Sequence, residues 1–239
     1  MAVKIIAFDA RRNSVATKER ILDCAEALFM EHGFESTSLR LITSAAAVNL
    51  AAANYHFGTK EDLFRAVLTR RLDPMNQERL ALLTRFEREA SPRALSCERI
   101  LAAMFIPALK LARDPERGGK NFLRLLGRAY ADPAPFIRRF LGEQYAIMIA
   151  RFKAAFGRAL PHLPRKELAW RLHFFMGALS YTLAGVDALK LMAALNPREA
   201  NDDEALLRRL APFLIAGLKA PLPDLIERDG EDAAWLSSR

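Results

Sequence analysis

Apolar side chains recur every three or four residues along most of the chain, the spacing that brings them to one face of an α-helix. The first apolar stripe consists of Ile21, Cys24, Ala25, Leu28 and Phe29. It predicts a helix from Thr17, a residue type suited to the N-cap, to His32, with Gly33 as a left-handed C-terminal cap. Residues 1–16 show no such period and are predicted to form a flexible arm.

Two short helices and the start of a third are predicted next. The first follows Thr37 or Ser38, and the second runs from Asn49, a good cap, to about His56. The third begins at Thr59, which stands three residues before Asp62 as in a capping box with Asp in place of Glu. The Leu72-Asp73-Pro74 segment predicts a change of direction, so we place a domain boundary there.

Beyond this boundary the chain predicts further helices, separated by segments that contain Pro or Gly. The longest span about residues 136–160, 165–195 and 202–218, and the polar segment 221–239 is predicted to be a frayed tail. The expected fold is therefore all-α. A three-helix domain with a helix-turn-helix (residues 17–72) precedes a larger helical domain for ligand binding and dimerisation (residues 73–220).

Composition supports a helical, cytoplasmic protein. Hydrophobic residues make up 51% of the 239 residues, with only 11 Gly. Cys24 and Cys97 have no metal-site or redox spacing, so neither a metal nor a cofactor is expected. The apolar run near the N-terminus is too short for a signal peptide, and no run is long enough for a membrane span.

Charge indicates a polyanionic partner without locating the contact. The net charge is +8, but the segment from Ser36 to Lys60 contains no Asp or Glu, whereas Arg40, His56 and Lys60 lie within it. A surface free of acids suits a segment that faces DNA phosphates, although a neutral loop would have the same composition. Two short helices around a tight turn are also the layout in which the second helix enters the major groove.

The N-terminal part of the sequence resembles the TetR family of bacterial transcriptional repressors. The matching segments are Gly33-Phe34, Ser38–Ile42, Ala46–Asn49, Asn54–Phe57 and Thr59–Leu63. The segments 122–127 and 170–174 are similar to fatty-acid-responsive repressors within that family. Ala47 departs from the family pattern, which usually has Gly in this turn. If the backbone there is left-handed, Ala costs roughly 1 kcal/mol relative to Gly.

The resemblance and the side-chain chemistry together assign the DNA contacts. Arg40 suits a phosphate or a guanine edge, Asn49 and Asn54 suit base edges, and Tyr55 and Lys60 suit phosphates. Small side chains would let the reading helix lie close to the bases. Tyr55 is equally compatible with a core position. The predicted DNA-binding residues are Thr37, Ser38, Arg40, Asn49, Ala51, Ala52, Asn54, Tyr55, His56, Thr59 and Lys60.

An apolar effector pocket is expected in the second domain. The candidates are Phe105, Leu109, Phe122, Leu125, Leu126, Tyr130, Phe140 and Tyr145. Taken alone, such residues are more often ordinary core. Arg124, Arg128, Arg138 and Arg139 are candidates for an acidic group at the pocket's mouth, although solvated faces are their default. The resemblance implies a long-chain fatty acid or acyl-CoA as the effector.

A homodimer is expected because two reading helices would match two half-sites of a pseudo-palindromic operator. The candidate interface residues are Trp170, Phe174, Leu179, Leu183, Leu206, Leu210 and Phe213.

Two other classes of function fit the sequence less well. His173, Ser180 and Asp187 share a helix face, but seven residues rise about 10.5 Å, too far for a hydrogen-bonded catalytic triad. An enzyme is therefore not expected. A DNA-coating protein without an effector would not need the long second domain.

Overall fold

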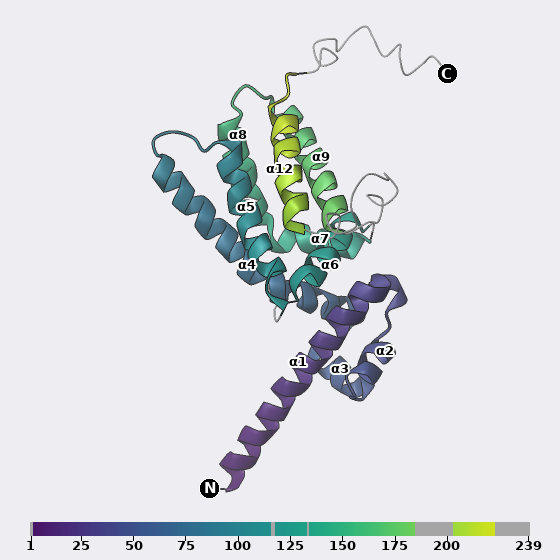
Figure 1. The fold of residues 1–239 in the computed structure, drawn as a ribbon. Helices are drawn as coiled ribbons and strands as arrows, with labels where there is room; N and C mark the ends of the chain where they lie inside the picture. The colour runs from purple at the N-terminus through teal and green to yellow at the C-terminus, as the bar shows by residue number, and fades with distance from the viewer. Residues whose placement is uncertain (1, 116–117, 133, 185–202, 223–239) are drawn as a thin grey trace, which may run out of the picture.

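The computed structural model describes residues 2–115, 118–132, 134–184 and 203–222, and within these ranges the chain forms helices and no strand (Figure 1). The all-α prediction is confirmed. The helices are α1 (Ala2–Ser36), α2 (Leu39–Ala45), α3 (Leu50–Phe57), α4 (Lys60–Ala90), α5 (Cys97–Ala112), α6 (Gly119–Ala131), α7 (Pro135–Gln144), α8 (Ala146–Ala159), α9 (Arg165–Leu183) and α12 (Asp203–Lys219).

Helix α1 is much longer than the sequence predicts. It begins at Ala2, so the expected arm of residues 1–16 is wrong from Ala2 onward, and Thr17 lies inside the helix rather than at its N-cap. Once the amphipathic part has formed, each added residue contributes a hydrogen bond without a new nucleation cost. The helix can therefore extend through a segment that lacks a stripe. Gly33, with φ 80° and ψ 173°, interrupts it where a cap was predicted.

The two short helices begin at the predicted caps. The Ser38 hydroxyl accepts a hydrogen bond from the Leu41 amide (3.1 Å), and the Asn49 side chain accepts one from the Ala52 amide (2.8 Å). Between these helices Ala47 has a φ of 51°, so the turn does have the left-handed backbone that usually favours Gly. The chain keeps the strained turn, and α3 is placed beside α2.

Helix α4 passes through the predicted boundary. It begins with the Thr59–Asp62 capping box and continues past Pro74 to Ala90, so the predicted change of direction is wrong. Pro74 is exposed, while Leu72 and Met75 beside it are buried. Burial of the flanking apolar residues offsets the hydrogen bond that Pro74 cannot donate. The two parts of the molecule therefore share one continuous helix.

The remaining helices form a bundle beside the upper half of α4, which lies at the outer edge of that bundle (Figure 1). The expected long helix of residues 136–160 is two helices, α7 and α8. They meet at Tyr145, whose hydroxyl donates to Asp73 on α4 at 3.0 Å. Helix α9 is described to Leu183, and the rest of the predicted helix 165–195 and most of the tail lie outside the described residues. Helix α12 agrees closely with the predicted range 202–218.

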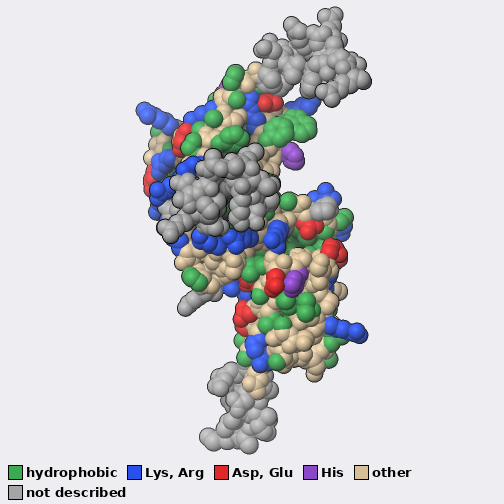
Figure 2. All heavy atoms as spheres, turned by 45° about the vertical axis from the view of Figure 1, so that its right-hand side comes forward, with side chains coloured by type: hydrophobic (Ala, Val, Ile, Leu, Met, Phe, Trp, Pro, Cys, Tyr) green, Lys and Arg blue, Asp and Glu red, His purple; other side chains and the backbone are tan. Residues whose placement is uncertain are grey.

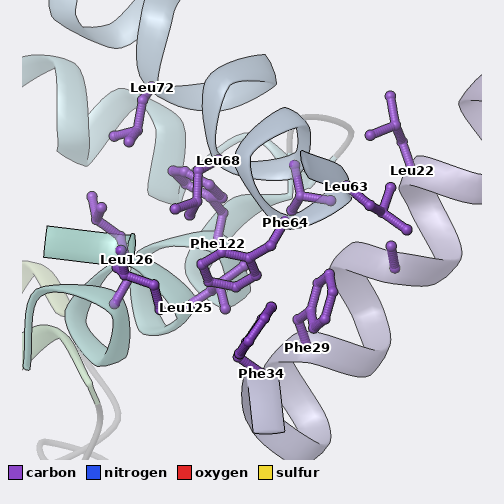
Figure 3. Packing of buried hydrophobic residues seen from close by; sticks show 14 of the residues in the cluster. Leu22, Phe29, Phe34, Leu63, Phe64, Leu68, Leu72, Phe122, Leu125 and Leu126 are labelled. Atoms are coloured by element: carbon purple, nitrogen blue, oxygen red, sulfur yellow. The ribbon is translucent and has the colours of Figure 1, made fainter. Parts of the chain in front are cut away.

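Two hydrophobic clusters hold the fold together. We call the first the junction core, because residues of α1, α4 and α6 interlock in it (Figure 3). Its members include Leu22, Phe29, Phe34, Leu63, Phe64, Leu68, Leu72, Phe122, Leu125 and Leu126. The second, the bundle core, includes Leu83, Ile100, Leu101, Phe105, Phe152, Phe156, Phe175, Leu214 and Leu218. Among the described helices, none has a stretch apolar and long enough to cross a membrane.

Candidate DNA interface and effector cavity

Most of the residues predicted to contact DNA lie on one accessible surface of α2, α3 and the start of α4. The exposed members are Ser38, Arg40, Asn49, Ala51, Asn54, Tyr55 and Thr59, and the half-buried ones are Ala52, His56 and Lys60. Tyr55 is 84% exposed, which excludes the core reading of this aromatic residue. Phe57, next to it, is half-buried and packs against the junction core. Helix α3 therefore has an apolar inner side and an open outer side.

Thr37 is a correction to the predicted set. Its side chain is fully buried, and its hydroxyl donates towards the carbonyls of Gly33 (2.7 Å) and Leu28 (3.2 Å). These carbonyls lie near the interruption of α1, where Gly33 leaves the helical conformation. Thr37 thus stabilises the end of α1 and has no free surface to offer DNA.

Lys60 has a structural role that the sequence did not reveal. Its ammonium group donates to the Phe34 carbonyl at 2.9 Å and lies 4.1 Å from the centre of the Phe34 ring. A cation over an aromatic face is favourable. The side chain therefore ties the start of α4 to the end of α1, beside the surface that carries Tyr55.

Basic side chains are not concentrated on the part that carries the reading helix. Figure 2 shows Lys and Arg side chains spread over both the upper and the lower part of the face it displays. The distinguishing feature of residues 36–60 is the absence of acids. This neutral to basic surface permits a close approach to phosphates.

Charged groups connect α1 to α4 and α6. Glu26 on α1 is 5% exposed and pairs with Arg70 and Arg71 of α4. Arg70 also contacts Asp23 at 2.7 Å. Farther along, Arg128 of α6 donates to the Met30 carbonyl of α1. Helix α1 is thus fixed to both α4 and α6 by polar contacts as well as by the junction core.

The bundle contains a cavity of about 460 Å³, within the usual range for small-molecule sites. Its lining comes from helices α4 to α9. The lining residues are Arg79, Met104, Ala129, Tyr130, Arg138, Leu141, Gly142, Tyr145, Met148, Ile149, Phe152, Lys153, Phe156, Ala169, Leu172, His173, Phe175, Met176, Leu179 and Leu183. This lining is mostly apolar, contains three cationic side chains and includes no Asp or Glu.

Only two of the eight predicted pocket residues, Tyr130 and Tyr145, line this cavity. Phe122, Leu125 and Leu126 are instead buried in the junction core, on the side of α6 that faces α1 and α4 (Figure 3). Phe140 packs against the junction core, whereas Phe105 and Leu109 belong to the bundle core and its rim. The sequence identified the apolar helices correctly. It could not show whether the apolar face of each helix packs in the junction core, in the bundle core or against the cavity.

Only some of the residues predicted to form the dimer interface are exposed. Trp170, Phe174 and Phe213 are large and exposed, at 52%, 64% and 68% respectively. Leu179 and Leu183 are corrections, because they line the cavity. Leu210 is half-buried against the bundle core, and the side chain of Leu206 lies outside the described residues. Three exposed aromatic side chains therefore remain on α9 and α12, which pack against each other.

Sequence reasoning missed Arg79, a charged residue inside the cavity wall. A signal was present, since Arg79 follows Leu72 and Met75 and precedes Leu83 at the spacing of the buried face of α4. A charge on an otherwise apolar stripe indicates a side chain that must be paired or used.

The catalytic alternative gains no support from the described residues. Ser180 is buried and donates to the Met176 carbonyl at 2.6 Å, while His173 is exposed on the same helix. Asp187 lies outside the described residues. Within the described parts of the chain, no cluster of His, Cys, Asp and Glu suits a metal ion.

Two family models match the chain. Residues 21–67 match the model described as bacterial regulatory proteins, tetR family, and residues 102–217 match a tetracyclin repressor-like C-terminal domain. The sequence is 31% identical over 144 residues to the transcriptional repressor BepR from Brucella suis, a match covering 59% of this chain and 65% of BepR. It is 40% identical over 62 residues to the repressor ComR from Escherichia coli, covering 26% and 30%. Both matches span less than two thirds of the relative.

Solved structures show the same fold. The fatty acid degradation regulator FadR from Bacillus halodurans aligns with a TM-score of 0.58 and 16% identity, covering 85% of this chain and 96% of that one. A complex of SmeT with triclosan gives 0.57 and 21%, covering 87% and 100%. FadR from Bacillus subtilis, in complex with stearoyl-CoA, gives 0.53 and 15%, covering 83% and 98%.

Proposed function

Because the chain belongs to the TetR family of bacterial regulatory proteins, we propose that it is a ligand-responsive transcriptional repressor. The observation that carries this proposal is a capped, exposed reading helix, α3, joined through α4 to a bundle with an apolar cavity. In the proposed DNA-bound state, two copies of α3 occupy successive major grooves of a pseudo-palindromic operator.

The proposed DNA contacts fall into two classes. Asn54 and Arg40 are exposed and have the donors and acceptors to read base edges. Tyr55 and the amides at the start of α4 are proposed to contact phosphates, which position the protein without reading sequence. Asn49 uses its side-chain oxygen to cap α3, so only its amide nitrogen is free for a base.

The proposed dimer forms through the aromatic patch of Trp170, Phe174 and Phe213. Trp170 and Phe174 stack with ring centres 5.9 Å apart, and both are more than half exposed. Burial of such a patch is favourable, and a two-fold pairing of α9 and α12 would form a four-helix interface. A monomer in solution, measured by light scattering, would contradict this part of the proposal.

The proposed effector is an apolar molecule with an acidic group, a long-chain fatty acid or its CoA thioester. The cavity has an apolar wall and cationic residues without a carboxylate. FadR from Bacillus halodurans, a protein of the same fold, is a fatty acid degradation regulator, and FadR from Bacillus subtilis was solved with stearoyl-CoA. Another was solved with triclosan, so the fold alone does not select a lipid.

The proposed response runs through helices that touch both the cavity and α1. Helices α4, α6 and α7 each contribute to the cavity lining and to the junction core. A ligand that prefers one arrangement of these helices would change the separation of the two reading helices. It can shift the equilibrium only by its difference in affinity for the two states.

The test is a fluorescence-anisotropy titration of the full chain against DNA from upstream of its own gene and against a scrambled duplex, with and without oleate or oleoyl-CoA. We expect selective binding that at least one of the two ligands weakens. Tyr55→Phe should weaken binding to both duplexes, whereas Asn54→Ala should reduce the preference for one over the other. Equal, weak binding to several native upstream sequences and to the scrambled duplex would support a DNA-coating role instead.

A further inference from the structure

Arg79 is a buried cation in the wall of the cavity. The residue is 6% exposed, and it lines the same space as Tyr130, Tyr145 and Phe152. Its Nε donates to the Met104 carbonyl at 2.9 Å, and one terminal nitrogen donates to the Asn76 side-chain oxygen at 3.0 Å. These two contacts orient the guanidinium from α5 and α4.

No carboxylate pairs with Arg79 among the residues that the structure describes. A guanidinium has five N–H donors, and the two neutral acceptors use only two of them. The hydroxyl of Tyr130 is a further neighbour, but it is neutral as well. Burial lowers the pKa of Arg79, and the contact with Tyr130 opposes that shift. The charge nevertheless persists at neutral pH, because arginine does not deprotonate in proteins.

Arg171, a second buried arginine, has only structural contacts and serves as a comparison for Arg79. Arg171 is 7% exposed and pairs with the Glu167 carboxylate at 2.7 Å. It also donates to the carbonyls of Leu218 (2.9 Å), Ala220 (2.6 Å) and Pro221 (3.1 Å), which fixes the end of α12. The charge of Arg171 is therefore paired with a carboxylate, and its N–H groups donate to acceptors within the chain. Arg79 instead lines an apolar cavity and has N–H groups beyond those that Met104 and Asn76 accept.

The cavity offers a second cationic region, which lies at its exposed edge. Arg138 and Lys153 line the cavity and are exposed, unlike Arg79. An anionic group at this edge would remain hydrated and gain little, since exposed ion pairs are weak. An anion that reaches Arg79 would instead neutralise a desolvated charge, for which planar, bidentate pairing with a carboxylate is well suited.

Resting on the proposed function, we infer that Arg79 binds the carboxylate of the effector, and that the effector is therefore a free carboxylic acid with an apolar body rather than its CoA thioester. The thioester carbonyl is uncharged and cannot neutralise the guanidinium. The acid enters with its carboxylate towards α4 and leaves its apolar body among Met148, Phe152 and Phe175. Since Arg79 belongs to the helix that begins beside the reading helix, the bound carboxylate acts directly on the connecting element.

The experiment compares head groups that share one apolar body. Two sets of probes are titrated into the full-length protein by calorimetry without DNA. The first is oleate, oleyl alcohol and oleoyl-CoA, and the second is dodecanoate, dodecanol and dodecanoyl-CoA. We expect the acids to bind at least about tenfold more tightly than the alcohols and the thioesters, the usual scale for a charge-assisted pair. Arg79→Met should reduce acid binding to the level of the alcohol, and Arg79→Lys should retain part of the preference.

Arg138→Met and Lys153→Met are the matched controls, because these cations line the exposed edge of the same cavity. Neither should change acid binding by more than about twofold. Thermal melting checks that each variant is folded, and replacement of an unpaired buried charge by Met is expected to be tolerated. If Arg79→Met did not fold, the head-group comparison on the unaltered protein would still decide.

Equal binding of acid and alcohol, tighter binding of the thioester, or a preference lost in Arg138→Met or Lys153→Met but kept in Arg79→Met would each overturn the inference. Failure of every probe to bind would overturn it too. The repressor proposal is tested separately, by operator selectivity without ligand. Selective DNA binding that only the thioester releases would leave the repressor standing and remove the role of Arg79.

Discussion

The ring of Phe34, at the end of α1, lies with its centre 4.6 Å from that of Phe136 at the start of α7. Phe34 also meets Phe64 of α4 edge-on at 5.1 Å. Helix α7 continues from Phe136 to Arg138, Leu141 and the cavity wall. One aromatic contact therefore connects the end of the first helix to the wall of the bundle cavity, within less than two turns of α7.

Replacing Phe136 should uncouple the cavity from the reading helix. We expect Phe136→Ala to lower the free energy of unfolding by about 1 to 2 kcal/mol, because the ring is half-buried. Operator affinity without ligand should change little, but the loss of affinity on adding ligand should shrink several-fold. Anisotropy titrations with and without effector measure both. The control is Phe140→Ala on the same helix, whose ring meets Tyr145 rather than Phe34. Equal uncoupling by both variants would contradict the role of Phe136.

Gly127 lies where the backbones of α6 and the end of α9 approach closely. A Cβ there would lie 2.8 Å from the Ser180 carbonyl oxygen and nearer still to the Ala184 nitrogen, so backbone would have to move. Gly127→Ala should therefore destabilise the protein by roughly 1 to 3 kcal/mol in urea unfolding. Gly157→Ala, where a Cβ would meet only the Leu168 side chain at 3.7 Å, should be neutral or slightly stabilising. Similar losses at both sites would show that α6 and α9 are not this close.

The left-handed turn at Ala47 predicts a stabilising substitution. Ala47→Gly should raise the free energy of unfolding by about 0.5 to 1 kcal/mol, since glycine adopts a φ of 51° without the Cβ clash. Ala45→Gly, in the last residue of α2, should have the opposite sign, because its backbone is helical. Denaturant melts of the two variants provide the measurement. Loss of stability in Ala47→Gly would mean that the turn relaxes in solution.

The Glu98–Lys219 pair predicts a contribution to stability that depends on pH. The hydrogen bond from Lys219, at 2.6 Å, is the main reason that the pKa of Glu98 falls from 4.5 to about 2. A carboxylate with a lowered pKa in the folded state stabilises the fold above its unfolded pKa. That contribution is lost as the pH falls from about 5 to about 2.

Glu98→Gln should therefore lower the melting temperature slightly at pH 7, by at most about 2 °C because both side chains are half exposed. At pH 2 the variant and the unaltered protein should melt together. Calorimetric scans from pH 7 to pH 2 test this difference. A gap that widened in acid would assign the shifted pKa to another carboxylate.

The elements that the sequence predicted well are those with local signals. Ser38, Asn49 and Thr59 cap their helices through bonds within three residues, so their side chains alone located α2, α3 and α4. The residues predicted to contact DNA came from the family resemblance and from side-chain chemistry, and most of them are exposed on α2, α3 and the start of α4. Ala in place of the usual Gly predicts strain if the turn is left-handed, and the φ of 51° at Ala47 is left-handed.

The elements that the sequence missed depend on distant partners. Nothing near Pro74 indicates that burial on both sides keeps α4 continuous, and nothing near Phe122 indicates that α1 covers it. Lys60 and Thr37 have the side chains of DNA contacts but serve the end of α1. Tertiary packing assigns such residues, because a helical period gives only the direction of a side chain and not its neighbour.

The continuity of α4 also makes the protein mechanically stiff between its two ends. A helix of 31 residues is about 46 Å long, so a tilt of a few degrees moves its far end by several ångströms. Because α4 is continuous, a change in its length also rotates the bundle about the helix axis relative to α3. Insertion of one residue into α4 would turn everything beyond it by about 100° relative to the reading helix. Insertions and deletions are therefore expected in the segments that connect the other helices rather than within α4.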